Sequence, residues 1–300
     1  MKKTLAILLT YNGARWLDTS LAALIAAEDL VDIAVVDNAS TDETRRLLTE
    51  KYAGSIQHLH LAEDNLGFGQ GHNLVFDQPY LYLENYEYVF LLNQDAFIER
   101  TELLELIKIA DSLEGKFILS PIHLAEGGAR DRWFDRHWNR YFVQEAAVEV
   151  GERVVPLREL TFVNAAVWLF PTRLVEEIGG FNPLFKHYGE DTNYVDRARH
   201  VGSKVYVANH VSAYHYREQQ RDAPYSEVEV LGIPLGHATY MVDPSRPFRQ
   251  SFSKLLAQWT RKLLGQTVRG ALGKARVTAR HLRALVANAG EFARHHRVKF

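Results

Sequence analysis

The sequence predicts an α/β protein with a doubly wound, mostly parallel sheet; one observation supports this fold class and two others exclude competing classes. Over the first 120 residues, short apolar runs alternate with segments of helical periodicity, the order typical of a parallel sheet covered by helices. The composition, 47% hydrophobic and 24% charged, is that of a folded domain. The absence of cysteine excludes disulfide scaffolds, thiolate metal sites and a cysteine nucleophile.

Strands are predicted at uncharged apolar runs, because strands buried on both faces of a sheet show no alternating pattern. In the first part of the chain they are expected at residues 3–10, 33–36, 56–61, 88–92 and 116–120, the last one stopped by Pro121. Helices are expected between them at residues 14–28, 41–48 and 101–113, with Ser40 or Thr41 as the N-cap of the second.

In the second part of the chain, residues 122–160 are expected to be irregular. The remaining elements are predicted as a buried strand at 161–170, a helix from Pro171 to Gly179, a helix at 191–200, and short strands at 204–207 and 211–214. No apolar run approaches the roughly 18 residues that span a bilayer, and the N-terminal run is too short for a signal peptide. We therefore expect a cytoplasmic protein.

Charge is distributed unevenly along the chain. Residues 251–300 contain 11 Lys and Arg but one acid, whereas the first 250 residues have a net charge of −12. This basic segment is predicted to be an amphipathic helical tail that follows a proline-containing linker. Its apolar face is formed by Phe252, Leu255, Leu256, Trp259 and Leu263.

Three interpretations of the tail remain open. The tail could lie on a membrane, with Trp259 among the residues buried in lipid and Lys254, Arg261 and Lys262 against anionic headgroups. It could bind nucleic acid, although no recognition motif accompanies the charges, so we expect no nucleic-acid partner. It could also pack on the acidic part of the chain or on a second subunit in a homodimer.

Polar residues follow the predicted strands at the edge where doubly wound sheets bind ligands. Asp37 ends one strand and either caps the next helix or accepts hydrogen bonds from a nucleotide. A dinucleotide-binding site is not expected, because the turn after the first strand has only Gly13. The three glycines of the segment 65–73 favour a flexible loop that approaches a ligand closely and leads into a helix.

Three further acids and a histidine are candidates for chemistry. Asp95 follows the strand at 88–92, where it either caps a turn or binds a hard divalent cation together with substrate phosphates. Glu190 and Asp191 begin a helix, either as partners of the helix dipole or as a general base and its neighbour. His215 is either a satisfied strand-end histidine or a second ligand for the cation at Asp95.

The order of these motifs is more specific than any one of them. The chain contains Thr10-Tyr11-Asn12, Val35-Val36-Asp37-Asn38-Ala39-Ser40-Thr41-Asp42, Asn65-Leu66-Gly67, Leu91-Leu92-Asn93-Gln94-Asp95, Gly179-Gly180-Phe181-Asn182, Gly189-Glu190-Asp191 and His215. Over roughly residues 3–216 this order resembles the family 2 inverting glycosyltransferases of the GT-A fold. It looks most similar to the rhamnosyltransferase-like branch that acts in cell-surface polysaccharide assembly, for example of O-antigen.

The resemblance implies a role for each candidate. Asp37 would contact the nucleobase of a nucleotide-sugar donor, and Asp95 would be the last acid of a D-x-D motif that holds Mg²⁺ or Mn²⁺, with His215 nearby. Asp191 would be the catalytic base, with Glu190 as its acidic neighbour. The other implied donor-binding residues are Thr10, Tyr11, Asn12, Asn65, Gly67, Asn93 and Gln94.

Two positions depart from the pattern of that family. Asn93 replaces the first acid of D-x-D, which weakens the expected grip on the metal, and Asn193 stands where many relatives have another acid. The resemblance also implies a catalytic domain over 1–225, with a donor half at about 1–121 and an acceptor half at about 122–225. Residues 226–300 would then form the linker and the tail.

The expected function is metal-assisted, inverting transfer of rhamnose or another hexose to a lipid-linked saccharide at the cytoplasmic face of the cell membrane. This expected function favours the membrane among the three interpretations of the tail. A glycoside hydrolase would need two carboxylates that flank one bond and would leave the nucleotide-binding elements without a role. A non-catalytic nucleotide-sugar or carbohydrate-binding module of the same fold is the alternative of a different class.

Overall fold

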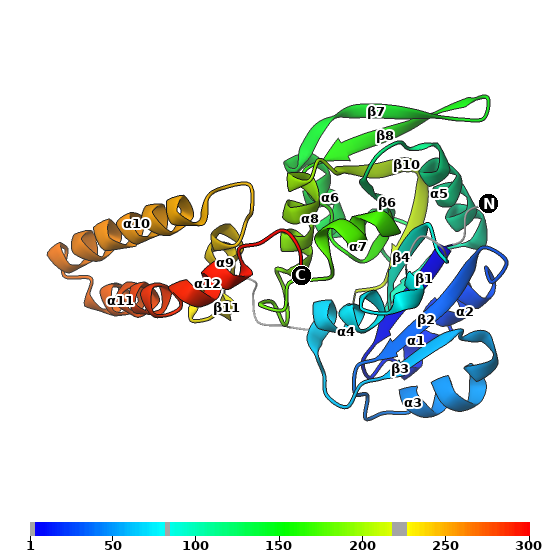
Figure 1. Cartoon of the computed structure of the whole chain (residues 1–300), viewed down its shortest axis with the longest axis horizontal. Helices are drawn as coiled ribbons and strands as arrows, with labels where there is room; N and C mark the ends of the chain where they lie inside the picture. The colour runs from blue at the N-terminus through cyan, green and yellow to red at the C-terminus, as the bar shows by residue number, and fades with distance from the viewer. Residues whose placement is uncertain (1–3, 82–84, 218–226) are drawn as a thin grey trace.

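A computed structural model describes residues 4–81, 85–217 and 227–300 (Figure 1). Residue 3 of the first predicted strand and the predicted domain boundary at 225 lie outside these described residues. The strands up to residue 124 are β1 (Thr4–Thr10), β2 (Val31–Asp37), β3 (His58–Leu61), β4 (Tyr88–Asn93), β5 (Ala96–Phe97) and β6 (Phe117–Leu124). The later strands are β7 (Phe142–Val150), β8 (Arg153–Leu160), β9 (Val167–Pro171), β10 (Lys204–His215), β11 (Glu229–Val230) and β12 (Ile233–Pro234).

Helices are distributed along the whole chain. The first six are α1 (Ala14–Leu17), α2 (Ser20–Ile25), α3 (Thr44–Arg46), α4 (Gly67–Phe76), α5 (Arg100–Ser112) and α6 (Arg132–Arg140). The remaining ones are α7 (Thr172–Ile178), α8 (Glu190–His200), α9 (Leu235–Met241), α10 (Phe248–Val268), α11 (Leu272–Ala287) and α12 (Ala289–His295). A π-helical turn continues α3, and short 3₁₀ turns lie at 53–55 and 79–81.

Within the described residues, one ten-stranded sheet has the order β3-β2-β1-β4-β9-β6-β10-β8-β7, with β5 paired to β10. The strands β3, β2, β1 and β4 run parallel, as expected. The other half of the sheet is mixed, because β9 runs antiparallel to both β4 and β6, and β8 runs antiparallel to β10. The predicted α/β class and the mostly parallel first half are therefore confirmed.

The central strands are buried on both faces, which explains their continuous apolar sequence. Along β1, Ala6 and Leu8 pack with α2 and α5 on one face, whereas Leu5 and Ile7 pack with α4 and α7 on the other. Alternate side chains of a strand point to opposite faces of a sheet, so each run of strand residues supplies both layers of the core. The sheet is thus covered by helices on two sides (Figure 1).

Two predicted helices differ in the structure, because one is divided and the other begins later than expected. The helix expected at 14–28 is divided into α1 and α2 at Asp18–Thr19, where the Thr19 amide bonds back only three residues, to Trp16. The helix expected at 41–48 begins at Thr44, because Asp42 Oδ1 accepts a hydrogen bond from the Thr44 amide at 3.0 Å. The expected N-cap at residue 40 or 41 is therefore wrong.

The prediction that Pro121 ends a strand is also wrong. β6 runs through Pro121 to Leu124 beside β10, and Pro121 pairs with Ala208, where the register of β10 shifts. Proline is tolerated at such irregularities because its missing amide removes no regular ladder bond. The same shift joins the two short strands expected at 204–207 and 211–214 into β10. The strand expected at 161–170 is also shorter, and only β9 (Val167–Pro171) forms.

Residues 122–160 are not irregular, contrary to the prediction. Asp131 caps α6 by accepting hydrogen bonds from the amides of Trp133 and Phe134. β7 and β8 then form an antiparallel hairpin that turns at Gly151, where φ is +59°. This hairpin forms the outer edge of the sheet (Figure 1).

The tail packs on itself and on one loop of the sheet domain. Leu255 and Trp259 of α10 are buried with Leu285 of α11 and Phe292 of α12, and this cluster includes Phe185. The apolar face that was expected to insert into lipid is thus largely covered by the chain itself, which corrects that expectation for Trp259. None of the described helices is long and apolar enough to cross a membrane.

A buried arginine joins the C-terminal residues to the sheet domain. Arg197 donates to the carbonyls of Ile178 and Gly180, both at 2.6 Å, and to Val298 O at 3.1 Å. Its Nε donates to Asn193 Oδ1 at 3.0 Å. Asn193, which stands where many relatives have another acid, therefore orients this guanidinium. Burial lowers the pKa of Arg197 to about 10, which still leaves it charged at neutral pH.

We expect Arg197→Met to destabilise the protein by about 3 kcal/mol or more, because it leaves several buried acceptors without a donor. Arg199, two residues along the same helix, is exposed, so Arg199→Met is a matched control that should change stability by less than about 0.5 kcal/mol. Urea denaturation of both variants measures the difference. Equal stabilities for the two variants would contradict the role given to Arg197.

Candidate active site

The carboxyl ends of β1, β2 and β4 bring the first candidate residues together. Thr10 lies opposite Asp37 in the β1–β2 pairing, and Leu9 lies opposite Asn93 in the β1–β4 pairing. The loops that follow these strands therefore start from the carboxyl ends of the parallel strands, which we call the strand edge (Figure 1). This is the edge at which open α/β sheets bind ligands.

Asp37 is buried but only half satisfied. Its Oδ2 accepts hydrogen bonds from Arg45 Nε at 2.5 Å and from the Ser40 amide at 3.1 Å. Its Oδ1 is also buried and has no hydrogen-bond partner among the described residues. Because a buried acceptor without a donor costs free energy, this oxygen retains the capacity to accept a hydrogen bond.

Gln94 is held against the end of β1. Its Oε1 accepts hydrogen bonds from Thr10 Oγ1 at 2.9 Å and from the Tyr11 amide at 2.8 Å. Tyr11 itself is exposed, with 43% of its surface accessible. The geometry joins the residues after β1 to those after β4 and leaves the Tyr11 ring free to contact a ligand.

Asn12 connects two loops of the edge. Its backbone adopts a left-handed conformation with φ of +48°, one that asparagine tolerates better than most residues. Its amide donates to Ser40 Oγ at 2.8 Å, and its Oδ1 accepts a hydrogen bond from the Thr41 amide at 2.8 Å. The segments after β1 and β2 are therefore bound to each other around Asn12.

The glycine segment is a packed helix start and not a flexible loop, which corrects the prediction. Asn65 Oδ1 accepts hydrogen bonds from the Gly67 amide and from Asn38, so it orders the turn into α4. Gly67 has φ of +80°, and a Cβ there would lie 1.9 Å from the carbonyl oxygen of Lys186. The glycine allows close approach of another protein segment, the loop that precedes Glu190.

Asp95 and His215 face each other beside the strand edge. β5 pairs with the end of β10, and this pairing sets His215 Nε2 at 3.3 Å from Asp95 Oδ1. Burial raises the pKa of the Asp95 carboxyl, but the hydrogen bond and charge of His215, with Arg217, outweigh burial and lower it below its usual value. Asp95 is therefore ionised at neutral pH.

The donor set at Asp95 suits a cation that also binds substrate. Among the described residues, no cluster of three or more His, Asp or Glu side chains could hold a metal ion by itself. One carboxylate oxygen and one imidazole nitrogen are the two protein ligands available here. Mg²⁺ and related ions are commonly held by one or two carboxylates together with substrate phosphates, so the residues fit a metal that binds together with a diphosphate.

The acidic pair at the start of α8 is buried. Burial and the neighbouring Asp191 raise the pKa of Glu190 to about 8, and Glu190 Oε2 has no hydrogen-bond partner among the described residues. Burial also raises the pKa of Asp191, although the Thr192 amide donates to its Oδ1 at 2.7 Å. Asp191 is the less buried residue of the two and can therefore meet a ligand more directly.

Backbone bonds connect the acidic pair to the strand edge. The Ala165 amide donates to the Asp191 carboxylate, and the Ala166 carbonyl accepts from the Asn93 amide at 2.9 Å. Ala165 and Ala166 thus connect Asp191 to the end of β4 at Asn93. Against the effect of burial, the positive charge of Arg217 acts to lower the pKa of both Asp95 and Asp191.

Sequence reasoning missed three residues that organise the site. Arg45 pairs with Asp37, and Arg217 bonds to Asp131 Oδ2 at 3.1 Å while it faces the acids. Asn73 exchanges two hydrogen bonds with the backbone of Phe181 and so fixes the Gly179–Asn182 segment on α4. The partners are 8, 86 and 108 residues apart, and the only local signal was the position of Arg217 two residues after His215.

Several solved structures have the same fold class. The S. aureus TarS 1–349 structure in complex with UDP is 18% identical to the chain, with a TM-score of 0.56, and the match covers 84% of this chain and 69% of that one. The complex of TarS 1–349 with UDP-GlcNAc gives 16% identity, a TM-score of 0.58, and coverages of 84% and 70%. GalNAc-T7 with UDP, GalNAc and Mn²⁺ gives 10% identity, a TM-score of 0.58, and coverages of 83% and 52%.

These similarities define a GT-A type α/β fold with an added group of C-terminal helices. The model of the family "Glycosyl transferase family 2" matches residues 6–177, more than half of the chain. The chain therefore belongs to glycosyl transferase family 2 and is a glycosyltransferase. None of the curated protein sequences compared with the chain matches it.

Proposed function

We propose that the chain moves a sugar from a nucleoside diphosphate sugar to a hydroxyl group of a saccharide acceptor, with inversion at the anomeric carbon. One observation supports this most directly: the half-satisfied Asp37, the Asp95–His215 pair and the buried acidic pair converge on one sheet edge. The TarS and GalNAc-T7 structures contain UDP. A uridine diphosphate sugar is therefore the first donor to test.

The donor would lie across the ends of β1, β2 and β4. Asp37 Oδ1 would accept a hydrogen bond from an N–H of the nucleobase, and Thr10, Tyr11 and Asn12 would border the base and ribose. Asn65 and Gly67 would act by ordering the turn under the nucleotide. Asn93 and Gln94 would lie on the diphosphate side.

Asp95 and His215 would hold Mg²⁺ or Mn²⁺ together with the donor diphosphate. The cation supplies charge neutralisation to the leaving group when it is bound. Arg217, whose charge already acts on Asp95 and Asp191, would face the same developing negative charge. This arrangement keeps a positive group near the diphosphate even though Asn93 replaces the first acid of the expected motif.

Asp191 would be the general base. Inversion needs a base that takes the proton of the acceptor hydroxyl while the nucleoside diphosphate leaves from the opposite face of the sugar. The raised pKa of Asp191 brings its basicity closer to neutral pH, which favours proton abstraction. Glu190, which stays more buried, would orient the acceptor.

We further propose the finer assignments that the motif order suggests. The sugar is rhamnose or another hexose, and the acceptor is a lipid-linked saccharide of a cell-surface polysaccharide such as O-antigen. The catalytic domain spans 1–225, with the donor half at about 1–121 and the acceptor half at about 122–225. The tail attaches the protein to the inner face of the cell membrane as a peripheral protein, and a homodimer through the tail is the competing arrangement.

Thermal stabilisation by a panel of nucleoside diphosphate sugars, with and without Mn²⁺, tests the proposal, because a ligand that binds only the folded state raises stability. Asp37→Asn should weaken donor binding by about 10- to 100-fold, the value of a hydrogen bond to a charged group. Asp64 is exposed beside Asn65, so Asp64→Asn is the matched control and should bind normally.

Two results would count against the proposal. If no nucleoside diphosphate sugar stabilises the protein, the site does not bind such donors. If a donor binds but no saccharide acceptor ever receives the sugar, the chain is better described as a non-catalytic binding module of the same fold.

A further inference from the structure

The turn between α10 and α11 is the part of the tail that points away from the sheet domain. The two helices form an antiparallel hairpin closed at Arg269–Ala271, where Gly270 has φ of +69°. Figure 1 shows the hairpin projecting from the sheet domain, with its turn at the far end. We call the hairpin tip the surface formed by residues 261–278.

Apolar side chains are exposed at the hairpin tip. Val268 is 87% exposed, Leu264 61% and Leu272 59%. Leu264 and Val268 are four residues apart and therefore lie on the same face of α10. In contrast to Leu255 and Trp259, which the tail itself covers, these three side chains contact solvent next to one another in the chain.

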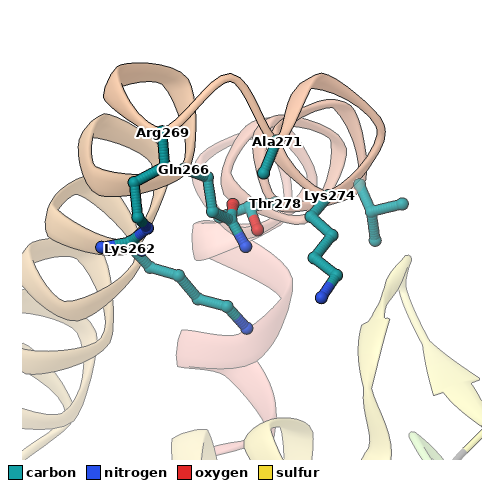
Figure 2. Close-up of a pocket in the computed structure, with 7 residues that line it drawn as sticks. Lys262, Gln266, Arg269, Ala271, Lys274 and Thr278 are labelled. Carbon is teal, nitrogen blue, oxygen red and sulfur yellow. The ribbon is translucent and has the colours of Figure 1, made fainter.

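All charged side chains of the hairpin tip are positive. Residues 244–290 contain no Asp or Glu. Lys262, Arg269 and Lys274 line a hollow of about 580 Å³ between the two helices, together with Gln266, Ala271, Val277 and Thr278. Figure 2 shows these side chains arranged around the hollow from both helices.

A buried amide lines the same hollow. Gln266 is 8% exposed, and its Oε1 has no hydrogen-bond partner among the described residues. Thr278, which is 4% exposed, borders the hollow from the other helix. The Gln266 Oε1 is an acceptor and cannot bond to a phosphate oxygen. The donors that the hollow offers to a phosphate are the amide N–H groups of Gln266, the Thr278 hydroxyl and the three cations.

We propose that the hairpin tip binds an anionic lipid bilayer, with a lipid phosphate in this hollow and Leu264, Val268 and Leu272 inserted among the acyl chains. The inference rests on the membrane attachment proposed above and identifies the surface responsible for it. Leu264 and Val268 lie on the side of α10 away from Lys262 and Gln266, so the tip would enter the bilayer end-on. Basic and exposed aliphatic side chains on one tip are the combination that anionic membranes attract. A nucleic acid would satisfy the charges but would leave the three aliphatic side chains in water.

Binding of the full chain to vesicles of neutral and of anionic phospholipids tests the charges. Lys262→Gln, Arg269→Gln and Lys274→Gln together should weaken partitioning to anionic vesicles by about 100-fold, since each surface cation contributes about 1 kcal/mol. The control removes three exposed charges far from the turn: Arg249→Gln, Lys254→Gln and Arg283→Gln. Equal losses in the two triple variants would overturn the assignment to the hairpin tip.

Insertion of the apolar residues is tested separately. The chain lacks cysteine, so Val268→Cys carries a single polarity-sensitive fluorophore, and Val154→Cys on the β7–β8 hairpin is the control. The emission should shift to the blue at position 268 but not at 154, and only with anionic vesicles. No shift at 268, or binding of an RNA oligomer in place of vesicles, would contradict the proposal.

Both experiments are independent of catalysis. Donor-induced stabilisation of the same variants should equal that of the wild type, since the hairpin tip is remote from the strand edge. Loss of vesicle binding with donor binding retained would therefore concern the membrane surface alone. Normal vesicle binding by a chain that binds no donor would instead refute only the proposed transferase reaction.

Discussion

Asp191→Asn should lower turnover by about 10²- to 10⁴-fold while donor binding persists, because the amide is nearly isosteric but cannot accept a proton and a general base typically contributes that factor. The measurement is the rate of nucleoside diphosphate release at saturating donor and acceptor. Burial raises the pKa of Asp191, and the base must be ionised. Wild-type turnover should therefore fall as the pH drops through this raised pKa and should be retained above it.

Glu190→Gln is the matched control for this prediction. It makes the same change from carboxylate to amide at the adjacent residue, so protein stability and site polarity change in similar ways. We expect turnover to decrease less than in Asp191→Asn. A larger loss in Glu190→Gln would assign the base to Glu190 instead.

Asp95→Ala should abolish the dependence of donor affinity on Mg²⁺ or Mn²⁺. Even outer partners of metal ligands contribute 10- to 100-fold to metal affinity, so loss of a direct carboxylate ligand should weaken metal-dependent donor binding by about 100-fold or more. Titration calorimetry with donor, in the presence of metal or of a chelator, gives both affinities. Glu152→Ala, at the exposed turn of the β7–β8 hairpin, should behave as the wild type.

Two results would contradict this prediction. Identical donor affinity of the wild type with metal and with chelator would show that Asp95 serves the donor without a cation. A variant at Asp95 that keeps the full metal dependence would place the cation on other residues.

The sequence alone was sufficient for the central sheet, for a physical reason. β1, β2 and β4 are buried on both faces, so nearly every residue is apolar and no alternation has to be recognised. The β7–β8 hairpin was missed because it lies at the sheet edge, where most residues of β7 are exposed. Its pairing with β10 joins segments about 50 residues apart, and no local pattern reports such a contact.

The site was predictable in part for a related reason. Asp37, Asp95 and the acidic pair directly follow or begin regular elements. Their places at the carboxyl ends of the parallel strands could therefore be expected from the order of the motifs. The role of Gly67 could not, because it depends on the carbonyl of Lys186, 119 residues away. Arg217 was missed because its interactions with Asp131, Asp95 and Asp191 are all made through the folded chain.

The tail shows where a helical pattern misleads. Its predicted apolar face was correct as a face, but Leu255 and Trp259 pack against Leu285 and Phe292 of the later helices. An amphipathic pattern predicts that one face of a helix is buried, but it does not predict which partner covers that face. The residues left for another partner, Leu264, Val268 and Leu272, lie beyond the predicted face at the turn.

The most direct test of the central claim is the anomeric configuration of the first product. The full chain is incubated with Mn²⁺, the nucleoside diphosphate sugar that stabilises it most and a saccharide acceptor, and the anomeric proton of the product is followed by NMR from the first turnovers. We predict a glycosidic bond of configuration opposite to that in the donor, formed at a rate that Asp191→Asn greatly reduces. A product that retains the configuration of the donor would contradict single-step transfer with Asp191 as the base.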